Sequence, residues 1–290
     1  MDMNTKYAII GLGKVGLTLA RHLYKRGCLG IIVSQSADYY NLSIEFKDIV
    51  VKNNIDNQLN DSDIIIIAKA DYYIKGTLTE LKSTCNLSGK IVIHLSGSMG
   101  LEQFEGYANT GAITASAHPY QTFYYPDPEI LNGVAWGVQT SGAFQLISDI
   151  IEGFGGQAID LSGMSISEKI LYHASAVAIS NYMTTITELS KSIANQAGIQ
   201  ADEFIPKIMR TTLENNIRAL TESNDIPLTG PIARGDIEVI ERHIKALEEN
   251  KVLQKSYSLI GMATAEIAYK QNILGSYEYQ KIIELLKKYQ

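Results

Sequence analysis

The stretch YAIIGLGKVGLTLARHL, residues 7–23, decides the fold of this 290-residue chain. It joins a short apolar run to a segment with helical spacing through three glycines, Gly11, Gly13 and Gly16. The first glycine permits a tight turn, the second lets the backbone approach a pyrophosphate, and the third lets the helix pack closely on the strand. The start of the helix then faces the anion. This order of strand, glycine loop and helix predicts a dinucleotide site, to which Lys14 and Val15 also contribute.

Short apolar runs rich in Ile and Val continue through the first half of the chain. They lie at residues 7–10, 30–33, 63–68, 90–95, 112–116 and 136–140. Because their apolarity is continuous and not alternating, we expect strands that are covered on both faces. The segments 17–26 and 74–83 between them have helical spacing. The first half is therefore predicted to be an α/β Rossmann domain with a mostly parallel, doubly wound sheet.

The sequence pattern changes after residue 161. Glycine and β-branched clusters become rare, and long segments with apolar positions at period 3.6 run almost to the end of the chain. Ser165 and Glu168 have the spacing of a capping box at the start of the first of these segments. We therefore expect a Rossmann domain over residues 1–161 and an all-helical domain over residues 162–290.

The composition argues against several classes of protein. No window approaches the roughly 18 apolar residues of a membrane span, and the first residues lack the pattern of a secretory signal. Two cysteines are too few for a disulfide framework or a cysteine metal site. A net charge of −6 with dispersed basic residues does not suit a nucleic-acid partner. We expect a cytoplasmic enzyme that acts on a small molecule, without a membrane partner and without a metal.

The end of the second apolar run bears on the choice between NADP and NAD. NAD enzymes usually place an acid at this strand end to bind the ribose 2′-hydroxyl. Here the run ends at Ser34, followed by Ser36, and the nearest acid is Asp38. Hydroxyl groups can donate hydrogen bonds to a 2′-phosphate, whereas a carboxylate would repel it. NADP is therefore favoured, and NAD is kept as the alternative because no Arg follows the strand.

Two further strand ends bring residues to the same edge of the sheet. The third apolar run ends in Ala68, and the fourth leads from His94 to Ser96 and Gly97. Open α/β sheets bind their ligands at the carboxyl ends of the strands. We therefore expect these four residues to contact the cofactor. The alternative for His94 is a buried histidine that orders its loop.

The segment SAHPYQTF, residues 116–123, follows the fifth apolar run. Pro119 biases His118 toward an extended conformation, so the strand should continue to His118 and then turn at the carboxyl edge. The imidazole and Gln121 would then lie on the substrate side of a nicotinamide. The alternative is a rigid loop that contains a structural histidine.

Five motifs, in order along the chain, carry a resemblance to a known family. They are IIGLGKVG at 9–16, IVIHLSGS at 91–98, AHPYQTF at 117–123, EKILYHASAVAISNY at 168–182 and LTGPIARGD at 228–236. The chain resembles bacterial Rossmann-like NADP oxidoreductases that have a helical C-terminal domain and are similar to deazaflavin-dependent NADP reductases. It is more distantly similar to the 6-phosphogluconate dehydrogenase and pyrroline-5-carboxylate reductase superfamily. The resemblance implies a 6-phosphogluconate-dehydrogenase-like C-terminal domain that completes the substrate site and forms a homodimer.

The resemblance draws attention to the first helix of the second domain. Lys169 and His173 lie four residues apart on one helical face, and Asn181 lies farther along. We predict that Lys169 and His173 provide proton transfer and electrophilic assistance, and that Asn181 orients the substrate. The alternative is that Lys169 is a surface residue of the first turn and that the other two satisfy buried polar contacts.

The loop LTGPIARGD contains the last candidate residue. Asp236 is placed to cap the helix that follows. Arg234 can hold a carboxylate or a phosphate through a bidentate contact, which predicts an anionic substrate or an additional contact with the cofactor. The alternative is that Arg234 pairs with Asp236 and stiffens the loop.

These observations together predict an NADP-dependent dehydrogenase or reductase. The substrate is expected to be a small, anionic carbonyl, imine or hydroxy acid bound between the two domains. The alternative function is that of a sensor, which binds NAD(P) without turnover.

Overall fold

The computed structural model describes residues 5–35, 39–223 and 225–289. The chain divides into two compact units, Met1–Ser180 and Asn181–Gln290, each with its own hydrophobic core. The division falls inside the long helix α5 (Ile166–Gln196). The boundary predicted at residue 161 rests on the sequence pattern and stays a prediction. Ser36 and Asp38 lie outside the described residues.

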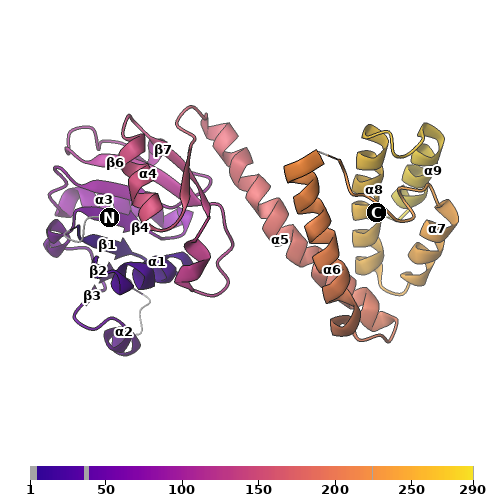
Figure 1. Ribbon diagram of the computed structural model, residues 1–290, viewed down its shortest axis with the longest axis horizontal. Coiled ribbons are helices and arrows are strands. Elements are labelled where there is room, and N and C mark those ends of the chain that lie inside the picture. The colour runs from indigo at the N-terminus through magenta and orange to yellow at the C-terminus, as the bar shows by residue number, and fades with distance from the viewer. Residues whose placement is uncertain (1–4, 36–38, 224, 290) are drawn as a thin grey trace. The chain divides into compact units, whose positions relative to one another are not determined.

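An eight-stranded sheet forms the centre of the first unit (Figure 1). Its strands are β1 (Tyr7–Ile10), β2 (Leu29–Val33), β3 (Val50–Lys52), β4 (Ile64–Ile67), β5 (Ile91–His94), β6 (Ile113–Pro119), β7 (Ala135–Thr140) and β8 (Gln157–Asp160). They lie in the order β3-β2-β1-β4-β5-β6-β7-β8, and β6 with β7 is the one antiparallel pair of this ladder. The predicted mostly parallel sheet and its six apolar strands are confirmed. The sequence pattern missed β3 and β8, which lie at the two edges of the sheet.

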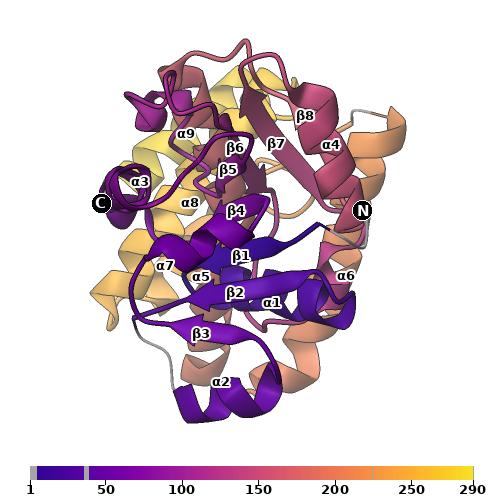
Figure 2. The ribbon, with the colours of Figure 1, turned by 90° about the vertical axis from the view of Figure 1, so that its left-hand side faces the viewer.

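Helices cover both faces of this sheet (Figure 2). On one face, side chains of α1 (Lys14–Lys25) and α4 (Phe144–Gly153) share a core with Ile9 of β1. On the other face, α3 (Asp71–Thr84) packs with the next residue of the same strand, Ile10. Because successive strand residues point to opposite faces, the continuous apolar runs serve two cores at once.

The remaining elements of the first unit are short. They are α2 (Tyr39–Glu45) and the 3₁₀ turns η1 (Asn57–Asp61), η2 (Leu101–Phe104) and η3 (Pro128–Leu131). Helix α5 begins at the predicted capping box, which is confirmed: the Ser165 amide donates to the Glu168 carboxylate (2.8 Å), and the Glu168 amide donates to Ser165 Oγ (3.3 Å).

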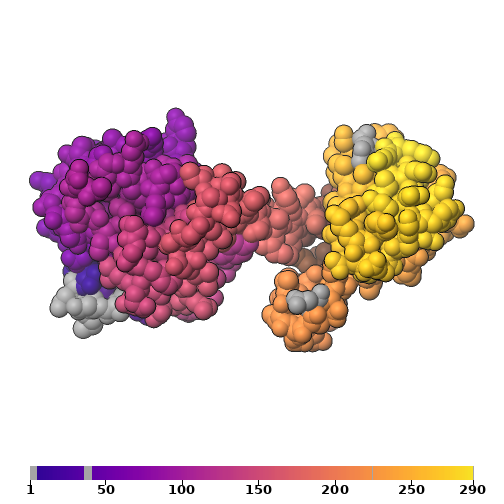
Figure 3. All heavy atoms as spheres, turned by 90° about the horizontal axis from the view of Figure 1, so that it is seen from above, coloured from indigo at the N-terminus to yellow at the C-terminus, as the bar shows by residue number. Residues whose placement is uncertain are grey.

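The described part of the second unit consists of helices and the loops that join them. They are the end of α5, α6 (Ala201–Arg218), the π-helical turn η4 (Ala219–Ser223), α7 (Ile237–Ala246), α8 (Lys251–Lys270) and α9 (Ser276–Lys287). Buried side chains of α7, α8 and α9 form its core. Figure 3 shows the side chains of the C-terminal part of the chain, in yellow, closely packed, and Tyr269 of α8 stacks on Tyr279 of α9 with ring centroids 4.5 Å apart. The predicted helical region is confirmed. None of the described helices has the length and apolarity needed to cross a membrane.

Candidate functional site

The glycine loop between β1 and α1 has a different environment at each glycine. Gly11 has φ +102°, a conformation that side chains rarely allow. A Cβ at Gly16 would overlap the carbonyl oxygen of Gly11, whereas a Cβ at Gly13 meets no described protein atom within 4 Å. Gly13 is also the N-cap of α1, and no side-chain hydrogen bond caps this helix. The open space and the first N–H groups of α1 therefore suit an anion.

Residues beside the glycine loop hold it in place. The Ala68 amide, just after β4, donates to the Ile10 carbonyl oxygen (2.8 Å). Val15 is half-buried and packs on the core. Lys14 is exposed, and its ammonium lies 4.2 Å from the ring centroid of Tyr124. The predicted cofactor residues of β1, α1 and β4 thus meet at one edge of the sheet.

The end of β2 lies beside a lysine that the sequence analysis did not consider. The Ser34 amide donates to the Lys52 carbonyl oxygen at the end of β3 (2.8 Å), and the Ser34 side chain is buried. The Lys52 ammonium forms an ion pair with Asp56. The backbone of Lys52 therefore lies next to the position predicted for a 2′-phosphate. The sequence pattern did not reveal Lys52, because the strand that it ends, β3, is only three residues long.

His94, at the end of β5, is fully buried (0% exposed) and orders the loop that follows it. The Ser96 amide donates to Nδ1 (3.3 Å), so the neutral ring carries its proton on Nε2 and donates to the Gly100 carbonyl oxygen (3.0 Å). Burial lowers the pKa of His94 to about 4. Both ring nitrogens are used within the protein. This geometry supports the alternative considered above, in which His94 orders its loop, and the predicted cofactor contact of His94 stays a prediction.

The loop after β5 is also ordered by Ser96. Its hydroxyl oxygen accepts hydrogen bonds from the amides of Ser98 (3.2 Å) and Met99 (3.0 Å). Ser98 in turn donates to the Asp71 carboxylate at the start of α3 (2.6 Å). The loop is therefore tied to the helix that follows β4, next to the edge where the glycine loop lies.

Gly97, His118 and His173 come together in the first unit, although they are far apart in sequence. A Cβ at Gly97 would overlap His173 Cδ2 and would lie 2.8 Å from His118 Nε2. The two histidine rings have centroids 5.5 Å apart. His118 lies in β6, which continues to Pro119 as predicted. In the described parts of the chain, no group of three or more His, Cys, Asp and Glu side chains could hold a metal ion.

Tyr172 of α5 completes this cluster and was missed from the sequence. Its hydroxyl lies 3.1 Å from His118 Nδ1. The ring lies over Gly137 in β7, where a Cβ would be 2.6 Å from the Tyr172 hydroxyl and 2.5 Å from Leu161 Cδ1. A glycine inside a strand often marks such a close approach, so Gly137 was the signal that could have found this contact.

The side chain of Lys169, in α5, is buried within the first unit (1% exposed). Its ammonium donates to Ser116 Oγ in β6 (2.7 Å), and the Ser116 hydroxyl lies 3.2 Å from the Met99 carbonyl oxygen, to which it donates. Burial lowers the pKa of Lys169 to about 8, against the opposing effect of the Glu102 carboxylate. The alternative that Lys169 is a surface residue is therefore wrong.

Gln139 is a second polar residue of this region that the sequence did not reveal. It lies opposite Ser116 in the antiparallel β6–β7 pair. Its Nε2 donates to the carbonyl oxygens of Leu161 (3.1 Å) and Met164 (3.2 Å), which ties the segment before α5 to the sheet. Its Oε1 is buried, has no hydrogen-bond partner in the described structure, and would be overlapped by a Cβ at Gly100.

The turn after β6 is exposed. Gln121 uses its side-chain oxygen to accept from the Thr122 amide (2.8 Å). Tyr120 hydrogen-bonds through its hydroxyl to Ser175 of α5 (2.8 Å), and Ser175 donates to the Tyr172 carbonyl oxygen (2.6 Å). The His-Pro segment is thus joined to the first turns of α5 by side-chain contacts.

Two predicted residues belong to the second unit. Asn181 and Arg234 are both exposed. The predicted cap at Asp236 is confirmed, since its carboxylate accepts from the Val239 amide (3.4 Å). Within the residues that the structure covers, no ion pair between Arg234 and Asp236 is found.

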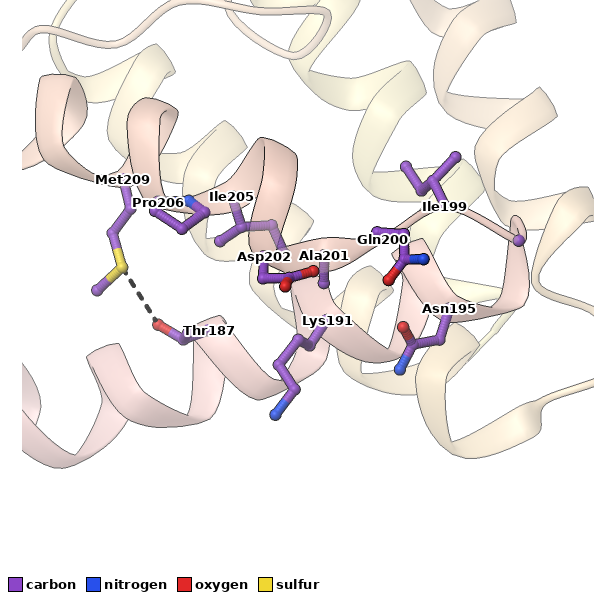
Figure 4. Close-up of a pocket in the computed structure, with 11 residues that line it drawn as sticks. Thr187, Lys191, Asn195, Ile199, Gln200, Ala201, Asp202, Ile205, Pro206 and Met209 are labelled. Carbon is purple, nitrogen blue, oxygen red and sulfur yellow. Dashed lines mark hydrogen bonds between the residues drawn. The ribbon is translucent and has the colours of Figure 1, made fainter.

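The second unit also contains a groove between the end of α5 and the start of α6, with a volume of about 680 Å³. Figure 4 shows the residues of both helices around it, including the contact between Thr187 Oγ1 and Met209 Sδ (3.9 Å). The charged residues of its lining are Lys191, which pairs with Glu188, and Asp202. The groove has none of the histidines that gather in the first unit.

Two family models match the chain. A Rossmann-like domain matches residues 2–119, and a domain of unknown function, DUF2520, matches residues 137–264. No curated protein matches. The pair of domains confirms the resemblance drawn from the five sequence motifs.

Solved structures similar to this chain have the same fold. An imine reductase from Myxococcus stipitatus in complex with NADP+ is 15% identical, with 98% of this chain and 99% of that chain covered and a TM-score of 0.67. A protein from Thermotoga maritima is 24% identical, with coverage of 92% and 99% and a TM-score of 0.65. A pyrroline-5-carboxylate reductase from Coxiella burnetii is 18% identical, with coverage of 92% and 98% and a TM-score of 0.55.

Proposed function

We propose that this chain, in which a Rossmann-like domain is followed by a DUF2520 domain, is an NADP-dependent oxidoreductase. It transfers a hydride between the nicotinamide and a small, anionic carbonyl, imine or hydroxy-acid substrate. One observation carries the proposal: the glycine loop and the cluster around His118 lie along the same carboxyl edge of the sheet. Three strand spacings, about 14 Å in total, separate β1 from β6. This separation suits a dinucleotide whose pyrophosphate lies at α1 and whose nicotinamide extends toward β6.

The choice of NADP is supported from two sides. Similar structures include an imine reductase in complex with NADP+. In this chain, Ser34 and Lys52 lie side by side at the strand ends where a 2′-phosphate would bind, and Lys14 adds a cation beside the glycine loop. NAD is the alternative, because Lys52 is already paired with Asp56.

In this proposal the residues of α5 supply the proton chemistry. His173 faces the Gly97 loop beside His118. Lys169 lies one turn earlier on α5, and its ammonium donates to Ser116 Oγ. Since Lys169 is enclosed, it acts through its charge and through the Ser116 hydroxyl. The exposed residues Gln121, Asn181 and Arg234 are proposed to bind and orient the substrate.

We also propose a homodimer formed by a helical domain of the 6-phosphogluconate-dehydrogenase-like type, in the cytoplasm. Large apolar side chains of α5 and α6 in the second unit are exposed: Tyr182, Ile186, Phe204, Ile208 and Ile217. Apolar surface of this extent usually marks an interface. Light scattering should give twice the chain mass, and Ile208→Glu should give the monomer mass; a monomeric wild type would contradict the dimer.

Binding and turnover test the function separately. Fluorescence titration should show tighter binding of NADPH than of NADH. A panel of keto acids and cyclic imines with saturating NADPH should reveal turnover, which His173→Ala should lower more than 100-fold while NADPH affinity stays within about threefold. His243→Ala, in α7, serves as the matched control. A protein that binds NADPH without turning over any substrate would be the sensor, and one that binds neither cofactor would contradict both functions.

A further inference from the structure

We infer that Tyr172 is a positioning residue that fixes the tautomer of His118, so that the Nε2–H group donates to the reacting oxygen of a carbonyl substrate. The inference rests on the proposed function, because it names the task of His118 in that reaction. It also selects one substrate class among those that the proposal allows.

The first step concerns the proton of the Tyr172 hydroxyl. Burial raises the pKa of Tyr172 to about 12, so the hydroxyl keeps its proton at neutral pH. The hydroxyl lies 3.1 Å from His118 Nδ1, and the Gly137 backbone donates a second hydrogen bond to its oxygen, which opposes the effect of burial on the pKa. The ring of Tyr172 meets the imidazole edge-on, with centroids 5.7 Å apart and an interplanar angle of 87°. If the hydroxyl donates to Nδ1, a neutral imidazole must carry its own proton on Nε2.

The second step concerns the space around the two ring nitrogens. A Cβ at Gly137 would lie 2.6 Å from the Tyr172 hydroxyl, and a Cβ at Gly97 would lie 2.8 Å from His118 Nε2. A glycine inside a strand is unfavourable unless a close approach requires it. Gly137 thus admits the tyrosine on the Nδ1 side, while Gly97 adds no Cβ on the Nε2 side, where the ring of His173 also lies.

The third step concerns the charge of His118. The charged and titratable groups that face it are His173, Lys169 and Tyr172 of α5, Asp71 of α3, and Tyr120. Burial lowers the pKa of His118 to about 4, and His173 and Lys169 add to this effect while Asp71 opposes it. The ring is therefore neutral near pH 7. A neutral imidazole with a fixed N–H stabilises developing negative charge without itself giving up a proton.

This donor selects among substrates. A carbonyl oxygen has lone pairs that accept from Nε2–H. An imine accepts hydride as the protonated iminium, whose nitrogen has no lone pair left to accept. In the carbonyl reaction, NADPH gives its hydride to the carbonyl carbon and becomes NADP+, and the C=O electron pair moves to the oxygen. The Nε2–H group stabilises this alkoxide until the proton that the proposed function assigns to His173 completes the alcohol.

NMR of the free protein tests the tautomer without any substrate. Nitrogen-15 correlation spectra should show His118 protonated at Nε2, with Nδ1 as the acceptor, and Tyr172→Phe should give a mixture of tautomers. Tyr257→Phe is the matched control, because the Tyr257 hydroxyl makes the same kind of contact with His243 Nδ1 (2.8 Å). A wild-type His118 that carries its proton on Nδ1, or that titrates above pH 6, would overturn the inference.

Kinetics with a carbonyl substrate tests the consequence. Tyr172→Phe should lower kcat by about 10- to 100-fold and leave KM within threefold, and Tyr257→Phe should change neither. His118→Gln places an amide near Nε2, whereas His118→Asn places it near Nδ1, so the Gln variant should be at least tenfold more active. The reverse order would overturn the inference. If the tautomer is found but no substrate turns over, the proposed function and the catalytic task of His118 both fail, and only the effect of Tyr172 on the tautomer stands.

Discussion

Gly13→Ala and Gly16→Ala should fail in opposite ways, because the two glycines have opposite surroundings. A Cβ at Gly13 meets no described protein atom within 4 Å, and its φ of −64° and ψ of −178° are open to alanine. A Cβ at Gly16 would overlap the backbone of Gly11 and lie 3.1 Å from the Ala68 Cβ. We expect Gly13→Ala to leave the free energy of unfolding within about 0.5 kcal/mol of wild type. Gly16→Ala should lower it by about 1–3 kcal/mol.

These free energies translate into melting temperatures. For a unit of this size, 1 kcal/mol corresponds to roughly 2–4 °C, so Gly16→Ala should melt about 2–12 °C lower than wild type. Gly13→Ala should melt within about 2 °C of it. The stability of the free protein therefore separates the packing glycine from the glycine that faces the ligand.

Adding NADPH should reveal the defect of Gly13→Ala, which the stability of the free protein does not show. At a concentration of 100 times the wild-type Kd, NADPH stabilises the wild type by about 2.7 kcal/mol. The methyl group added by Gly13→Ala takes space intended for the pyrophosphate, at a cost of about 2 kcal/mol, or about 30-fold in Kd. The stabilisation by NADPH should then fall to about 0.9 kcal/mol.

Thermal unfolding with and without NADPH, together with a fluorescence titration, measures both effects. A Gly13→Ala protein that keeps the full NADPH-induced shift would refute the placement of the pyrophosphate at Gly13. A Gly16→Ala protein with the wild-type melting temperature would refute the steric argument for the third glycine.

Three further outcomes follow from the cluster in the first unit. The pKa of Lys169 is about 8 in the folded chain and about 10.5 in the unfolded chain, so the folded state binds fewer protons between these two pH values. The free energy of unfolding should therefore rise with pH over this range. Urea unfolding of the wild type, compared with Lys169→Met, should show a gain of about 3 kcal/mol from pH 8 to pH 10.5. His94 and His118 have pKa values of about 4, below the ordinary 6.5, so stability should fall as the pH drops from about 6.5 to 4, and the proton NMR signals of both rings should stay constant from pH 5.5 to 8. Gly137→Ala should lower the free energy of unfolding by about 1–3 kcal/mol, measured from urea midpoints, because the new Cβ crowds Tyr172; an unchanged midpoint would argue against this packing.

The sequence predicted those features that depend on neighbours along the chain. Continuous apolar runs identified six strands, the glycine spacing located the loop at α1, and the capping box marked the start of α5. The edge strand β3 escaped because it is three residues long, and β8 escaped because Gln157 and Asp160 leave only two apolar residues in it. In parallel sheets continuous apolarity is the main signal, and these two edge strands lack it.

The contacts that define the candidate site could not be predicted in the same way. Tyr172 lies 54 residues from His118, and Lys169 lies 53 residues from Ser116, so each pair becomes visible only once β6 and α5 are brought together. His94 is a case in which the sequence located the residue correctly but could not decide its role. Its place at a strand end fits a ligand contact and a structural role equally well, and the deciding group is the carbonyl oxygen of Gly100.

The division of the chain inside α5 has a consequence for protein engineering. Lys169, Tyr172 and His173 are part of a helical domain by sequence, but by packing they belong to the unit that ends at Ser180. A chimera of two relatives joined near residue 161 would combine the histidine of one parent with the tyrosine of the other. With a junction after Ser180, both residues of each contacting pair come from the same parent. The segment to exchange when specificity is redesigned therefore ends in the middle of a helix and not in a loop.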